Sequence, residues 1–101
     1  MALERYGYIV KSPSLEMFKH HARIQSEGFD MSVAGVSSVT EAQAVAQEMI
    51  TKGIQLIELC GGFMPEDAQS IRDAINDHIP VGVVQYTPEE RSRLAAELSK
   101  E

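Results

Sequence analysis

The sequence has little of several features, and each shortage excludes a class of protein. One cysteine among 101 residues rules out an internal disulfide. No apolar stretch approaches the roughly 20 residues that a helix needs to cross a bilayer. The first residues include Glu4 and Arg5 where a signal peptide would carry its apolar core. No linker or low-complexity segment divides the chain. These shortages predict one cytoplasmic domain over residues 1–101, with no membrane partner.

Positive charge is also scarce in this sequence. Nine lysines and arginines stand against 15 aspartates and glutamates, and the net charge is -6. Because such a surface repels phosphate backbones, we expect no nucleic-acid partner. A chain of this length buries only one small core, and association of identical chains is a common way to bury more surface. We therefore expect a homo-oligomer, with a dimer as the first expectation.

The chain does contain a fourfold alternation of strand-like and helix-like segments. Apolar and β-branched runs predict strands at 5–10, 29–36, 54–60 and 79–86. Apolar residues with helical spacing predict helices at 12–28, 40–53, 64–78 and 87–101. Strands separated by helices favour a parallel sheet. We expect an open α/β sheet of four mainly parallel strands with flanking helices, in the flavodoxin-like order 2-1-3-4. A two-layer α/β fold with one antiparallel strand is the alternative.

Capping residues predict where these helices begin. Thr40, followed by Gln43 three residues later, resembles a capping box. Thr87 is the predicted N-cap of the last helix, and Pro88 after it suits the first helical position. The helix at 12–28 is supported by a stripe that leaves out Met17 and Ile24; the stripe consists of Leu15, Phe18 and Ala22.

Polar and small residues follow each predicted strand. In an open parallel sheet, ligands gather outside the carboxyl ends of the strands. The double glycine Gly61-Gly62 lets backbone N–H groups approach a ligand, and the positive end of the next helix favours an anion. The alternative interpretation is a tight turn that needs positive φ. We predict a small anionic ligand at this edge; its candidate binding residues are Ser12, Ser37, Gly61, Gly62, Phe63 and Gln85.

Glu58 and Cys60 share one face of the third predicted strand. A carboxylate within an apolar strand must be paired, protonated or in contact with water, and a protonated one suits acid–base catalysis. Cys60 lies shortly before a helix start, which stabilises a thiolate. The alternatives are a salt bridge for Glu58 and an inert, buried thiol for Cys60. The two residues define a second hypothesis, a small-molecule lyase, isomerase or hydrolase. A third is a structural subunit without a ligand.

The three histidines do not predict a metal centre. His20 and His21 are adjacent, so on a helix they point in different directions and cannot chelate as an i, i+4 pair does. His78 lies at a predicted helix end. We expect no metal site, and no motif identifies a cofactor.

Two strings carry a resemblance to a known family. "GIQLIELCGGF" at 53–63 and "VGVVQY" at 81–86 resemble a family of small bacterial α/β proteins known only as a domain of unknown function. The resemblance covers residues 29–86 and includes the helix "EAQAVAQEMITKG". It implies a compact α/β domain without an assigned reaction. Its marked positions are Glu58, Cys60, Gly61, Gly62 and Phe63; a further glycine of the pattern is replaced here by Met64.

Overall fold

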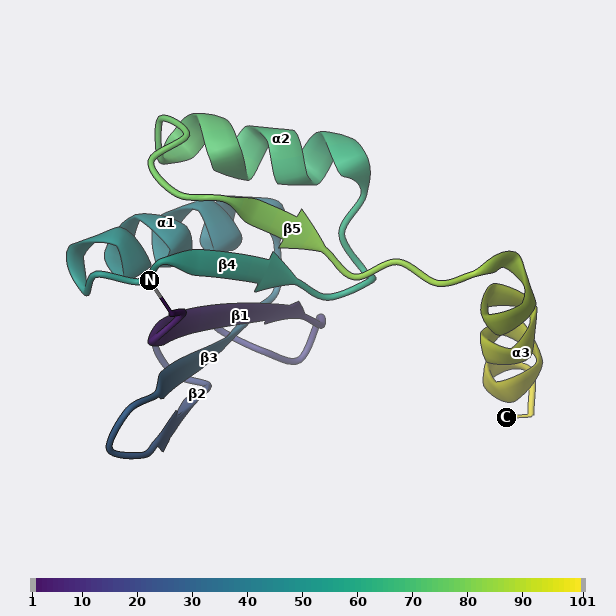
Figure 1. Cartoon of the computed structure of the whole chain (residues 1–101). Coiled ribbons are helices and arrows are strands. Elements are labelled where there is room, and N and C mark those ends of the chain that lie inside the picture. Colours follow the sequence, from purple (N-terminus) through teal and green to yellow (C-terminus); the bar gives the residue numbers. More distant parts are fainter. Residues whose placement is uncertain (1, 101) are drawn as a thin grey trace.

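Five strands form one sheet in the computed structural model, which describes residues 2–100 (Figure 1). The strands are β1 (Arg5–Lys11), β2 (His21–Gln25), β3 (Asp30–Val36), β4 (Leu56–Leu59) and β5 (Val81–Val83). Their order is β2-β3-β1-β4-β5. Strands β3, β1, β4 and β5 are parallel, and β2 pairs antiparallel with β3. The helices are α1 (Val39–Thr51), α2 (Pro65–Ala74) and α3 (Pro88–Leu98).

The predicted fold class is confirmed, with one strand more than expected. The four predicted strands correspond to β1, β3, β4 and β5, and they lie in the predicted order 2-1-3-4. The antiparallel edge strand β2 belongs to the alternative that we considered. Strands β4 and β5 are shorter than the predicted 54–60 and 79–86, since each begins later and ends earlier than predicted.

The predicted helix at 12–28 is wrong. Residues 12–20 form turns, and β2 pairs with β3 as a hairpin. Phe18 has φ of 62°, which no helix accommodates. Met17, which the helical stripe left out, packs against the core. Pairing with β3 satisfies the backbone groups of β2 that face β3, and the ion pair between Arg23 and Asp30 joins the two strands. Tertiary pairing therefore overrides a weak helical pattern here.

The start of α1 also differs from the prediction. Its N-cap is Ser38, whose side chain accepts a hydrogen bond from the Glu41 N–H at 3.2 Å, so the predicted cap at Thr40 with Gln43 is wrong. The Glu41 carboxylate accepts hydrogen bonds from the backbone N–H of Ser37 at 2.9 Å and of Met17 at 3.1 Å. These bonds fasten the 12–20 segment to the helix.

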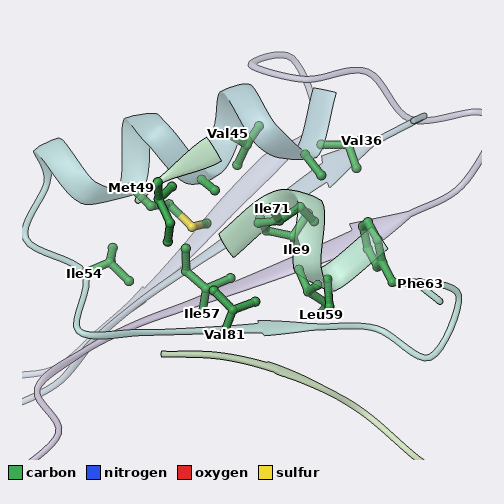
Figure 2. Packing of buried hydrophobic residues seen from close by; sticks show 14 residues of the cluster. Ile9, Val36, Val45, Met49, Ile54, Ile57, Leu59, Phe63, Ile71 and Val81 are labelled. Carbon is green, nitrogen blue, oxygen red and sulfur yellow. The ribbon is translucent and has the colours of Figure 1, made fainter. Parts of the chain in front are cut away.

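Helices α1 and α2 cover the same face of the sheet (Figure 1). The connections β3–α1–β4 and β4–α2–β5 run in the same direction across the sheet, and right-handed crossovers place such helices on one face. The core lies between these layers, as Figure 2 shows. It contains Ile9, Val36, Ala42, Val45, Ala46, Met49, Ile54, Ile57, Leu59, Phe63, Ala68, Ile71, Ile75 and Val81.

The opposite face of the sheet, which we call the open face, is covered by no helix of residues 2–100 (Figure 1). Because paired residues of a sheet share a face, the register places Tyr8, Val33, Glu58 and Gly82 together on it. The β1–β3 crossover runs in the opposite direction to the other two, so a right-handed helical crossover would have covered this face. The connection between β1 and β3 contains no such helix and instead contains β2, which lies in the sheet as its edge strand.

Candidate functional site

A groove opens at the carboxyl ends of β4 and β5, beside the start of α2. Its volume is about 590 Å³. Gly61 and Phe63 follow β4, and Gln85 follows β5, so three of the predicted binding residues line one groove. The other lining residues are Met64, Pro65, Ala68, Arg72, Val83, Val84, Tyr86 and Arg91.

The double glycine forms a turn closed by a hydrogen bond from the Phe63 N–H to the Cys60 carbonyl at 3.1 Å. Neither Gly61 nor Gly62 has positive φ, so the interpretation that this turn requires positive φ is wrong. Gly61 is required for a different reason. A Cβ on Gly61 would lie 2.9 Å from Cε2 of Tyr86, which is too close for two carbon atoms. The missing side chain therefore lets the Tyr86 ring lie against the backbone and form one wall of the groove.

Two arginines bring positive charge to this groove. Arg72 on α2 donates to the Val81 carbonyl at 2.8 Å, which fixes its guanidinium beside β5. Arg91 on α3 donates to the Tyr86 carbonyl at 3.4 Å. Neither arginine forms an ion pair with a carboxylate of residues 2–100. Their charge is therefore available to a ligand.

The N-terminus of α2 is already occupied by the chain itself. The Asp67 carboxylate accepts a hydrogen bond from the Met64 N–H at 2.8 Å, and Glu66 adds a second negative charge to the first turn. These carboxylates interact with the helix dipole in the place of an anion. The helix end that we expected to favour an anion is thus compensated from within, and the arginines are the positive groups that remain.

The other predicted binding residues lie at the same edge of the sheet but outside the groove. Ser12 follows β1, and its N–H donates to the Val36 carbonyl at 2.9 Å. Ser37 follows β3 and donates its N–H to Glu41. Gly62 is exposed beside Cys60. Phe63 lines the groove as a buried core residue, and Nζ of Lys11 lies 5.1 Å from its ring centroid.

Glu58 lies on the open face, where Tyr6 donates its hydroxyl hydrogen to the Glu58 carboxylate. The carboxylate thus has a tyrosine as its partner, where the sequence suggested a salt bridge as the alternative. Burial, and then the hydrogen bond to Glu58, raise the pKa of Tyr6 to about 12. Burial, followed by the nearby Cys60, Tyr86 and Glu58, also raises the pKa of Tyr8.

Cys60 is half-buried and packs against the core. Its Sγ accepts a hydrogen bond from the backbone N–H of Lys11 at 3.3 Å. His21 on β2 is separated from β4 by β3 and β1, which corresponds to about 14 Å across the sheet. His78 precedes β5, at the opposite end of the strands. Neither His21 nor His78 therefore lies beside Cys60, and Nδ1 of His20 accepts a hydrogen bond from the Glu16 N–H at 2.9 Å.

Among residues 2–100, no three histidine, cysteine, aspartate or glutamate side chains come together in a group that could hold a metal ion. Within the same residues, no helix has the length and apolar character required to span a membrane.

Sequence reasoning missed the two arginines and Tyr86. One signal was available for Arg72: it shares a helical face with Ala68, Ile71 and Ile75, so it had to point toward the sheet. Arg91 lies on the same face of α3 as Leu94 and Leu98, but this face is exposed in its own chain, so the spacing does not predict that Arg91 reaches the groove. No local pattern predicts that Tyr86 returns to Gly61, because that contact depends on how two loops meet.

Comparison with known proteins places the chain in a family. No curated protein and no solved structure matches it. A family described as "Family of unknown function (DUF6506)" matches residues 4–99. The match confirms the predicted resemblance to a domain of unknown function and extends it from residues 29–86 to almost the whole sequence. The chain therefore belongs to the Family of unknown function (DUF6506).

Proposed function

We propose that this protein is a binding module for a small organic anion, held in the groove beside Gly61. One observation carries the proposal: Arg72 and Arg91 line the same groove, and neither is neutralised by a carboxylate of residues 2–100. The chain as a whole has a net charge of -6, so two unpaired arginines at one place are a marked local exception. Guanidinium groups form charge-assisted hydrogen bonds with carboxylates and phosphates.

The shape of the groove indicates the rest of the ligand. Its volume of about 590 Å³ lies within the range of small-molecule sites. Phe63, Val83 and Tyr86 supply apolar walls, and Gln85 supplies amide donors and acceptors. A bare inorganic ion would leave these walls uncovered. The groove thus suits a molecule with an apolar body and one carboxylate or phosphate group.

Phenyl phosphate is a suitable first probe, because it joins an aromatic ring to an anionic group. We expect a titration followed by amide NMR to shift the resonances of Gly61, Gln85 and Arg91. Inorganic phosphate and phenol test the two halves of the probe separately, and we expect each to bind at least tenfold more weakly. Equal binding of phosphate and phenyl phosphate would show that the apolar walls do not contribute to ligand binding.

A matched pair of substitutions on α3 tests the role of Arg91. We expect Arg91→Gln to weaken phenyl phosphate binding about tenfold, which corresponds to one charge-assisted hydrogen bond. Arg93→Gln removes the same charge from the same helix, but Arg93 is paired with Glu90 and lies outside the groove. We expect this control to bind as the wild type does. Equal losses in both variants would reduce the interaction to general attraction by the surface.

The hydrogen bond between Tyr6 and Glu58 supports a second candidate, an enzyme that uses Glu58 and Cys60. A tyrosine that donates a hydrogen bond to a carboxylate places side by side two groups suited to acid–base catalysis on a small molecule. This candidate has less support, because Cys60 packs half-buried against the core and neither His21 nor His78 lies beside it. Rapid alkylation of Cys60 by iodoacetamide near neutral pH would favour the enzyme. A rate like that of an ordinary exposed thiol would count against it.

A further inference from the structure

Helix α3 stands apart from the rest of its chain. All of its residues are exposed, and Figure 1 shows it beyond the end of the sheet, following an extended segment. Leu94 is 42% exposed and Leu98 is 64% exposed, although both lie on one face of the helix together with Ala95. A helix of eleven residues is marginal in water by itself. An apolar stripe on such a helix requires a surface to pack against.

The open face of the sheet lacks a helix packed on it, whereas α3 lacks a surface on which to pack. The helices of the described chain cover only the other face (Figure 1). Tyr8 and Val33 lie half-exposed on the open face, and Ile24 at its edge is 62% exposed. Gly82 also lies on this face, and a Cβ built on it would meet no atom within 4 Å. A glycine within a strand often marks the close approach of another element. The open face therefore offers an apolar surface with room for a helix.

The segment between β5 and α3 is held so that α3 leaves its own sheet. The Val84 N–H donates to the Leu59 carbonyl at 2.9 Å, which continues the ladder beside β4. The Tyr86 ring then lies against the backbone of Gly61, and Arg91 donates to the Tyr86 carbonyl at 3.4 Å. These contacts fix the direction in which α3 starts. The apolar stripe of α3 and the open face of the same chain thus remain separate.

The accessible surface area of the chain is larger than expected for a compact monomer, and the excess indicates how much surface a partner could bury. The chain exposes 6667 Å², whereas a monomeric protein of 11.1 kDa is expected to expose about 5,700 Å². The excess of about 1,000 Å² is close to the roughly 800 Å² that each partner buries in a protein interface of standard size. The radius of gyration, 14.3 Å, likewise exceeds the value of about 12.7 Å for a compact domain of this length.

We propose that two copies of this chain form a dimer in which α3 of each copy packs its Leu94–Leu98 stripe on the open face of the other. A second copy is the occupant that the structure favours, because every chain carries both an uncovered helix and an uncovered sheet face. Reciprocal exchange satisfies both surfaces at once with two-fold symmetry. It also supplies the helical layer that the β1–β3 crossover lacks. The proposal does not depend on the ligand of the groove, although Arg91, which lines that groove, lies on the same face of α3 as Leu94 and Leu98.

Sedimentation equilibrium of the full chain is the first test, with Leu94→Glu as the disrupting variant. We expect the wild type to have twice the mass of one chain and Leu94→Glu to have the mass of one chain. Ala96→Glu adds the same charge to α3, on the side of the helix away from the stripe, and should remain a dimer. Because both positions are exposed, circular dichroism should report the same folded sheet in all three proteins. A monomeric wild type, or a Leu94→Glu variant that stays dimeric, would overturn the proposal.

Mixing two variants tests the exchange itself. Gly82→Glu places a charge on the open face where the chain's own packing leaves space, and we expect it to be monomeric. Leu94→Glu keeps an intact open face, and Gly82→Glu keeps an intact α3. An equimolar mixture should therefore form a mixed dimer through one intact contact, weaker than the wild type. A mixture that stays monomeric contradicts the exchange. Hydrogen exchange that finds α3 protected in a monomeric wild type would instead place the helix on its own sheet.

Discussion

Tyr6 donates its hydroxyl hydrogen to the carboxylate of Glu58 on the open face of the sheet. The two residues come from neighbouring parallel strands, and their side chains meet because Tyr6 and Glu58 point to the same face. The bond resolves the problem of a carboxylate within the apolar strand β4. It also connects stability to the protonation of a tyrosine, which two measurements can test.

Replacing Tyr6 with phenylalanine should destabilise the protein. The change leaves the half-buried Glu58 carboxylate without the donor that the structure gives it. We expect a loss of about 1 kcal/mol in the free energy of unfolding, the typical net contribution of one hydrogen bond. Urea denaturation at neutral pH measures this loss. Tyr8→Phe is the control, since the Tyr8 hydroxyl makes no hydrogen bond to residues 2–100, and an equal loss in both variants would contradict the role of the bond.

The same pair predicts a loss of stability at alkaline pH. The pKa of Tyr6 is raised to about 12 in the folded protein, from the ordinary tyrosine value of 10.0. A raised pKa means that the folded state holds the proton more tightly, so this stabilisation is complete below about pH 10 and is lost as the pH rises toward 12. Tyr6→Phe should lack this component of the alkaline decline. The phenolate absorbance of the three tyrosines can follow it, and a wild type in which all three ionise together near pH 10 would contradict the assignment.

Glu41 predicts the opposite dependence at acid pH. Backbone hydrogen bonds, above all the one from Ser37, lower the pKa of Glu41 below the ordinary glutamate value of 4.5. The charged carboxylate is therefore the form that the fold prefers. Its stabilisation is complete above about pH 4.5 and is lost as the pH falls through the lowered pKa.

Glu41→Gln keeps an acceptor for the N–H groups of Ser37 and Met17 but removes the charge. We expect the thermal midpoint of the variant to lie below that of the wild type at neutral pH, and the two midpoints to converge as the pH is lowered. Thermal unfolding followed at several pH values measures this difference. Glu66→Gln at the exposed start of α2 is a control for the general effect of removing a carboxylate. A difference between wild type and Glu41→Gln that stays constant with pH would contradict the prediction.

Much of the fold could be predicted because most of its signals are local. The four apolar runs, the cap at Thr87 and the position of Pro65 each depend on residues next to one another, and together they led to the strand order 2-1-3-4. The segment that forms β2 could not be predicted in this way. Its strand character depends on pairing with β3 and on the ion pair between Arg23 and Asp30, which a local pattern does not contain.

In the candidate site, too, some residues could be predicted from the sequence and others depend on tertiary packing. Gly61, Phe63 and Gln85 could be placed at one edge because the ends of parallel strands meet there. Ser12 and Ser37 lie at that edge too, but the rule does not say how far along it a groove extends. Arg72 and Arg91 enter from helices, and their directions depend on how α2 packs on the sheet and how the segment after β5 is held.

Gly61 and Gly28 provide a prediction in which one substitution has opposite effects at two sites. A Cβ on Gly61 would lie 2.9 Å from the Tyr86 ring, so Gly61→Ala must push the ring away from the turn. Tyr86 is partly exposed and can move, so we expect a cost of about 1 kcal/mol, at the low end for overpacking. A Cβ on Gly28 would meet no atom within 4 Å, and Gly28 does not have positive φ. Gly28→Ala should therefore stabilise the fold by about 0.5 kcal/mol, because it restricts the unfolded chain.

Urea denaturation of both glycine variants measures the two opposite changes in the free energy of unfolding. The NMR resonances of the Tyr86 ring report its displacement. In Gly61→Ala the ring resonances should move, and phenyl phosphate should bind more weakly because one wall of the groove is lost. In Gly28→Ala neither should change. A Gly61→Ala variant with unshifted Tyr86 resonances and unchanged stability would mean that the ring does not lie against the turn in solution. The double glycine would then have no role in shaping the groove.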